Sequence, residues 1–211
     1  MHSTLLGGLL TASVVFAVWS YLDLLWDIKS KDKMQPIATR IAVAGAMLLS
    51  CVSVVVGKGS LGDAFLTGVY AILALVAVWL TWGRRQGAEI SLLDTNCMAI
   101  SLTGAVLFAV TGQSSMGITC AILADIAAYT PTVRESWKRP ATQPVRTYVI
   151  GLVAAAFALA ASMTQSGGEW KITMWFTIYL LLIDAGLPVI IVSRKRIAAR
   201  KATRKKEAAA L

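Results

Sequence analysis

The sequence predicts an all-α, polytopic membrane protein with seven transmembrane helices. The 211 residues are 57% hydrophobic and only 15% charged, whereas a soluble domain carries roughly 25% charged residues. The apolar residues form seven blocks, and each block is about as long as a bilayer-spanning helix of ~20 residues. The basic residues concentrate in alternate connectors between the blocks, which is the pattern that sets orientation in a membrane.

The seven blocks are expected helices. They cover residues 4–26, 36–57, 62–82, 90–111, 115–136, 144–164 and 171–193. The first block lacks a positively charged n-region and is too long for a signal-peptide core, so we expect a retained helix. The third and fourth blocks carry Asp63 and Asp94 near their starts. Pro36 and Pro144 are expected in the first turn of their helices, where a missing N–H costs nothing.

The charges assign a side to each connector. When connectors alternate between sides, 18 of the 20 lysines and arginines fall on one side, including Arg40 in the connector 27–40. The other side holds only Lys58 and Lys171. The positive-inside rule then places the basic tail in the cytoplasm and the N-terminus outside, which requires an odd number of spans. Tryptophans at the block ends support these positions of the membrane interfaces, because indole rings favour the interface. They are Trp26, Trp82, Trp137 and Trp170.

A near-repeat 108 residues apart organises the chain. Tyr21, Gln35, Pro36 and Thr39 recur as Tyr129, Gln143, Pro144 and Thr147. Blocks one to three therefore pair with blocks five to seven, and Gly59-Ser60 opposite Gly167-Gly168 extends the register toward the third helix. Two three-helix units joined by one linker helix have the same orientation, so we predict a 3+1+3 parallel repeat. The expected parts are units at 1–86 and 114–193, a linker helix at 87–113, and a cytoplasmic tail at 194–211.

The second unit carries a family resemblance. Residues 121–148 read AILADIAAYTPTVRESWKRPATQPVRTY: a helix ends in Tyr-x-Pro-Thr, basic residues follow, and a new helix begins. With the 3+1+3 plan, this segment resembles the SWEET, SemiSWEET and PQ-loop clan, and an uncharacterised bacterial branch of similar seven-helix proteins. The clan has Pro-Gln near the end of the first helix of each unit. Here Pro131 is followed by Thr132, and the first unit has Asp23 in place of the proline. The resemblance implies a small-solute transporter that alternates access between its two units.

Polar residues inside the blocks are the candidate site, because such residues are costly in lipid and mark pathways. Asp125 lies near the middle of its block, and Tyr129 lies four residues later on the same helical face. Pro131 frees a backbone carbonyl one turn earlier. We expect a solute or proton site here; the alternative is that Asp125 only hydrogen-bonds a neighbouring helix.

The last block supplies a second set of candidates. Asp184 precedes Gly186 and Pro188, which predicts a locally bent helix of the kind that lines a cavity. Trp175 and Tyr179, four residues apart, could stack on a solute or pack against lipid. In the first unit, Tyr21 is the repeat partner of Tyr129, with gating and interface anchoring both open. Asp23 and Asp94 are close enough to the interface to be solvated.

Familiar catalytic and cofactor sites are not expected. His2 is the sole histidine, no phosphate-binding glycine loop is present, and Lys171 lies at the start of the last block rather than at its middle. Cys51, Cys97 and Cys120 lie inside apolar blocks without metal-ligand spacing, so we expect small buried hydrophobic side chains. We therefore predict no enzyme, no metal and no cofactor.

Two functions follow from these observations. The first is transport of a small solute, coupled to protons if Asp125 or Asp184 titrates. The alternative is a non-transporting receptor, scaffold or assembly partner that uses its basic tail for contact. Expected partners are the lipid bilayer, the solute, and anionic lipid headgroups at the tail, with a homo-oligomer or protein partner left open. Nucleic acid is not expected, since no aromatic residues interleave with the tail charges. The expected location is a bacterial-type inner (cytoplasmic) membrane.

Overall fold

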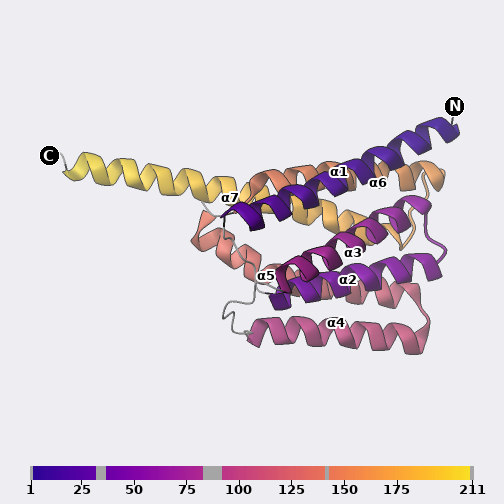
Figure 1. The fold of residues 1–211 in the computed structure, drawn as a ribbon. Coiled ribbons are helices and arrows are strands. Elements are labelled where there is room, and N and C mark those ends of the chain that lie inside the picture. Colours follow the sequence, from indigo (N-terminus) through magenta and orange to yellow (C-terminus); the bar gives the residue numbers. More distant parts are fainter. Residues whose placement is uncertain (1, 32–36, 83–91, 141–142, 210–211) are drawn as a thin grey trace.

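The computed structural model describes residues 2–31, 37–82, 92–140 and 143–209, and their regular structure is entirely helical. The helices are α1 His2–Lys31, α2 Ile37–Val56, α3 Leu61–Trp82, α4 Leu92–Thr111, α5 Ser114–Lys138, α6 Val145–Gln165 and α7 Met174–Ala209. Successive helices run in opposite directions through one bundle (Figure 1). The predicted all-α class is therefore confirmed for the described residues.

Five of these helices are long and apolar enough to cross a membrane. The qualifying segments are Thr4–Trp26, Leu61–Leu80, Ser114–Lys138, Val145–Gln165 and Met174–Arg200. Within the residues searched, α2 and α4 contain shorter apolar segments, Arg40–Val56 and Leu102–Thr111. Five such helices are the mark of an integral membrane protein. Seven crossings, the 3+1+3 repeat and the orientation stay predictions.

The outer surface of the bundle is apolar. Large hydrophobic side chains are exposed along the outward faces of the helices, among them Val15, Phe65, Ile72, Leu102, Leu123 and Leu182. A water-soluble monomer rarely exposes contiguous apolar surface of this kind. The four tryptophans predicted at the interface are all exposed near helix ends; they are Trp26, Trp82, Trp137 and Trp170. Lipid is therefore the natural solvent for this surface.

For description, α1–α3 and α5–α7 are taken as two sets of three helices, with α4 at the side. α3 packs against α1 and α2, and α7 packs against α5 and α6. The main contacts between the sets are α1 with α6 and α2 with α5. Exchanging α1–α3 with α5–α7 reproduces these pairs, but α3 also packs against α6, and this contact has no substantial counterpart between α7 and α2. α4 packs only against α5 and α2 among the substantial contacts, and Figure 1 shows it at the edge of the bundle.

The bundle has two ends. The α2–α3 end holds the connections 57–60, 112–113 and 166–173, and the α5–α6 end holds residues 139–140 and 143–144 between those two helices. α7 extends past the bundle at the α5–α6 end (Figure 1).

Small residues let the helices approach closely, as is common where packing rather than water drives association. A Cβ built on Gly104 of α4 would lie 2.5 Å from the Cβ of Cys120 on α5. A Cβ on Gly62 of α3 would lie 3.0 Å from Ser162 Oγ and 3.3 Å from the Ala158 carbonyl on α6. Only glycine permits these two crossings without displacing the partner helix.

The last helix differs from its prediction. α7 begins at Met174, whereas a 108-residue step from the start of α3 at Leu61 would place it at Glu169. The two preceding turns also differ, because Gly167 and Gly168 have φ of 66° and 91° while Lys58 is the left-handed residue of the first turn, with φ 51°. The repeat spacing therefore slips at the third helix, and the register expected from Gly59-Ser60 does not continue into it.

Two other boundaries are corrected. α7 runs through Pro188 to Ala209, so the tail predicted as a separate part at 194–211 is a helical extension over its described residues. Pro144 is the residue before α6, with φ −81° and ψ 96°, rather than a member of its first turn. Gln35 and Pro36 lie outside the described residues.

We expect Gly104→Ala to destabilise the bundle. The new methyl group would meet a Cβ that no rotamer change can move, so α4 and α5 must separate, at about 1–3 kcal/mol. Gly8→Ala is the matched control, since a Cβ there meets nothing within 4 Å and alanine favours helix. The free energy of unfolding in mixed detergent and SDS measures both; equal stability of the two variants would contradict the close crossing.

Candidate functional site

A cavity of about 80 Å³ lies between the two sets of helices. Residues of all six helices of α1–α3 and α5–α7 line it, and no described residue of α4 does. The lining residues are Ser20, Tyr21, Leu24, Arg40, Val43, Met47, Tyr70, Ala74, Ala77, Ala128, Tyr129, Thr132, Thr147, Tyr148, Leu180 and Asp184. A space of this size holds a few water molecules or a small solute.

Repeat-related positions face this cavity together. Four pairs of lining residues are 108 positions apart: Ser20 and Ala128, Tyr21 and Tyr129, Leu24 and Thr132, and Arg40 and Tyr148. Equivalent faces of α1 and α5, and of α2 and α6, therefore turn toward the same space. The third helices contribute residues that do not keep this spacing, in line with the slip at the start of α7.

Three of the predicted site residues, Tyr21, Tyr129 and Asp184, line the cavity. Asp125 and Tyr179 lie outside the lining and bind each other: the Tyr179 hydroxyl donates to Asp125 Oδ2 at 2.9 Å. Asp125 is fully buried, and its Oδ1 has no hydrogen-bond partner among the described residues. The pair connects α5 to α7, which is the helix-to-helix contact that the alternative interpretation of Asp125 predicts.

The structure does not bring Trp175 to the cavity. Its side chain is 55% exposed on the outer surface, so it does not form a stacking pair with Tyr179 toward a cavity solute. Pro131 lies within α5, but its side chain, like that of Asp94, is outside the described part. α5 nevertheless continues past Pro131, which leaves the carbonyl of Ala127 without an intrahelical donor.

Asp184 is held where α7 meets α6. Its side chain is 8% exposed, and a Cβ on Gly151 of α6 would lie 2.6 Å from its Oδ2. Glycine at 151 therefore makes the space that the carboxyl group occupies. Pro188, four residues later, lacks the N–H that would bind the carbonyl of Asp184. The carboxyl group and this carbonyl both belong to the turn of α7 that lines the cavity.

Arg40 is a site residue that the sequence analysis assigned to a basic connector. It lies one turn inside α2, is 5% exposed, and lines the cavity. Its Nε and Nη2 atoms are buried without a hydrogen-bond partner among the described residues. The positive-inside count missed Arg40, because it assigns any arginine near a helix end to the membrane interface. The sequence feature that could have identified it is its position inside the apolar block 36–57.

A second missed cluster surrounds Asp63 at the α2–α3 end. Ser60 and Asp63 form the start of α3, where Ser60 Oγ accepts the backbone N–H of Asp63 at 3.1 Å in an N-cap arrangement. The fully buried Asp63 carboxyl group accepts hydroxyl hydrogen bonds at 2.7–2.9 Å from Ser60, from Ser162 of α6 and from Thr177 of α7. The cluster therefore connects α3 to both α6 and α7.

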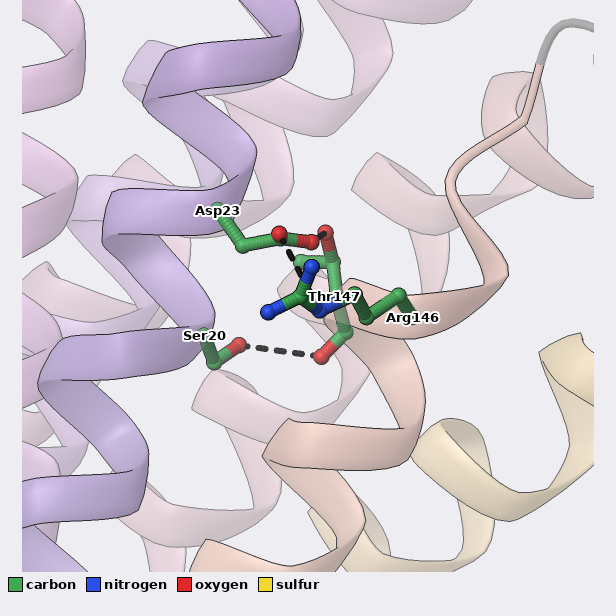
Figure 2. A network of polar contacts seen from close by, with 4 residues as sticks. All are labelled: Ser20, Asp23, Arg146 and Thr147. Atoms are coloured by element: carbon green, nitrogen blue, oxygen red, sulfur yellow. Dashed lines mark hydrogen bonds and ion pairs between the residues drawn. The ribbon is translucent and has the colours of Figure 1, made fainter.

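A smaller network connects α1 to α6 toward the α5–α6 end (Figure 2). Thr147 Oγ1 donates to Asp23 Oδ2 at 2.8 Å, and Arg146 Nε lies 3.5 Å from Asp23 Oδ1. Ser20 Oγ donates to the Thr147 carbonyl at 3.1 Å. Asp23, expected to be solvated, is instead half-buried and bound to α6. Because Ser20 and Thr147 also line the cavity, this network borders it directly.

Comparison of the chain with protein-family models, with curated proteins and with solved structures found no match. The cavity and the two polar networks are therefore the basis for a function.

We expect Asp63→Ala to cost about 2–4 kcal/mol of unfolding free energy, because three buried hydroxyl groups lose their acceptor. Asp23→Ala is the comparison, with a cost of no more than about 1 kcal/mol, since Arg146 is largely exposed and its ion pair is screened. Unfolding in mixed detergent and SDS measures both. A loss at Asp63 no larger than that at Asp23 would show that the Asp63 cluster does not hold the helices together.

Proposed function

We propose that this chain is a membrane transporter or facilitator of a small solute, and that it works by alternating access between α1–α3 and α5–α7. The observation that carries the proposal is the cavity between these sets, with all six of their helices in its wall. Many secondary transporters bind their solute between two repeated units in this way. Four lining pairs at the repeat spacing support the same interpretation.

The two polar networks are suitable gates. The Asp63 cluster joins α3 to α6 and α7 at one end, and the Asp23 network joins α1 to α6 toward the other. Both contain side-chain hydrogen bonds that join the two sets. Contacts of this type can break and re-form with a modest net change in free energy. Alternating access requires the two networks to open in turn, one for each side of the membrane.

The proposed topology has seven spans in a 3+1+3 parallel repeat, with α4 as the linker. Its position beside the bundle, and the absence of its described residues from the cavity wall, support that role. The side holding 18 of the 20 basic residues is the cytoplasmic side, so the Asp63 cluster is the outer gate. The resemblance of residues 121–148 to the SWEET, SemiSWEET and PQ-loop clan favours the same plan, in a bacterial-type inner membrane.

Proton coupling is part of the proposal. Asp184 lines the cavity, and the Asp125–Tyr179 pair connects the same helix, α7, to α5. A carboxyl group at the solute and a second one at a moving helix contact could exchange protons during the cycle. Uptake into liposomes with and without an inward proton gradient tests this coupling.

A second candidate function rests on α7. The helix continues past the bundle with Lys195, Arg196 and Arg200 on it, which suits a scaffold or receptor that contacts a partner through its basic extension. Truncation after Arg194 removes these three residues and keeps the contact of Arg194 with the Trp137 carbonyl and ring. A transporter should keep its flux after this truncation, whereas a scaffold of this type should lose its partner.

We expect a cross-link at the outer gate to stop transport. Ser60 Oγ and Ser162 Oγ are 2.6 Å apart, so cysteines at both positions would have sulfur atoms close enough for a disulfide. In a background without the native cysteines, oxidised Ser60→Cys/Ser162→Cys should lose uptake in liposomes, and reductant should restore it. The solute panel comprises sugars, amino acids, vitamins and organic acids.

Each single-cysteine variant is the control, and it should keep its uptake under oxidant. Uptake that continues through a fully cross-linked protein would contradict opening at the Asp63 cluster. A folded, uncross-linked protein that moves no member of the panel would contradict transport itself.

A further inference from the structure

We propose that the cavity binds its solute through a single carboxylate group, which docks on the guanidinium group of Arg40. The inference rests on the proposed function and names the chemical class of the solute: a short organic monocarboxylate.

The buried positive charge of Arg40 favours an anionic ligand. The side chain is 5% exposed inside the bundle, and among the described residues no carboxylate pairs with it. A guanidinium group keeps its charge in proteins, and an uncompensated charge away from water is strongly unfavourable. A bound anion in the cavity would offset this charge.

The geometry of the free atoms selects the anion. Nε and Nη2, the two unpartnered nitrogens, are buried. They lie on one edge of the guanidinium plane, and they can donate two parallel N–H groups to a ligand once the Arg40 side chain turns further into the cavity. This edge matches the two oxygens of a carboxylate in a bidentate pair. An alcohol or an amide oxygen would leave one of the two donors unsatisfied.

The rest of the wall restricts the charge and the size of the solute. Asp184 lines the same cavity; when its carboxyl group is protonated, the single positive charge of Arg40 offsets a monoanion but not a dianion such as phosphate. The Tyr70 hydroxyl is buried and unpartnered, and it can donate a further hydrogen bond to the bound anion. Ala74, Ala77 and Val43 provide apolar wall, and the volume of about 80 Å³ admits only a short chain.

Paired ligands make the test sharp. Full-length protein in detergent is titrated by calorimetry with acetate, propionate, butyrate and lactate, each beside its neutral amide, and with inorganic phosphate. We expect saturable binding of at least one carboxylate, with no binding of its amide or of phosphate. Arg40→Met should weaken binding roughly tenfold or more, and Arg40→Lys should also weaken it, because an ammonium group cannot form the fork.

The control variant is Arg134→Met, which removes an exposed arginine of α5 and should leave affinity unchanged. Binding of no carboxylate, equal binding of an amide, binding of phosphate, or full affinity in folded Arg40→Met would each overturn the proposal. If Arg40→Met does not fold, the carboxylate–amide pairs on the wild-type protein decide it, and Tyr70→Phe should reduce affinity.

A zwitterionic solute is distinguished by Asp184→Asn. A monocarboxylate should bind this variant at least as well as the wild type, whereas a weaker affinity would indicate an ammonium group at Asp184 and overturn the single-charge solute. The experiments also distinguish failure of the binding site from failure of the transport proposal. Arg40-dependent binding without flux in liposomes would remove transport but keep the site, and flux without Arg40-dependent binding would remove the site but keep transport.

Discussion

A polar group inside a membrane bundle has no water to bind, so it must find its partners in the protein. This constraint explains most of the polar contacts in the chain. Asp63 accepts three hydroxyl hydrogen bonds, Asp23 binds Thr147 and Arg146, and Asp125 binds Tyr179. Except for the Ser60–Asp63 bond at the start of α3, each of these contacts crosses from one helix to another, so satisfying the polar groups also positions the helices. Arg40 is the buried charge for which the described residues supply no partner, and it faces the cavity.

The packing between helices is of a different kind. Apolar burial does little to hold helices together in lipid, so close approach at small residues carries the contacts. Gly62 and Gly104 allow such approaches, and alanines fill much of the interior between α1 and α6. This packing is dense but lacks direction, whereas the hydrogen-bond networks specify which turns meet.

The helical class and the approximate positions of the helices were largely predictable. Long apolar blocks and their connectors are local features, and the observed helices overlap the seven blocks, although α7 runs well past the predicted end at residue 193. The site was predictable only where a residue was conspicuous in itself. Tyr21, Tyr129 and Asp184 attract notice as polar residues in apolar blocks. Arg40 and Asp63 did not, because each lies near a block end, where a charge normally meets water or headgroups. Trp175 was misleading for a related reason, since spacing along α7 does not say which face turns outward.

By itself, therefore, the sequence determined the helical class, the membrane character and the candidate repeat, since all three depend on composition and order along the chain. The tertiary structure decided which faces of the helices meet. It placed Arg40 and Tyr148 at one cavity, turned Trp175 outward, and joined Asp63 to residues about a hundred positions away. Such choices depend on the rotation and depth of each helix against its neighbours. Rotation and depth follow from how side chains of distant segments fit together. The periodicity of a single helix carries no information about that fit.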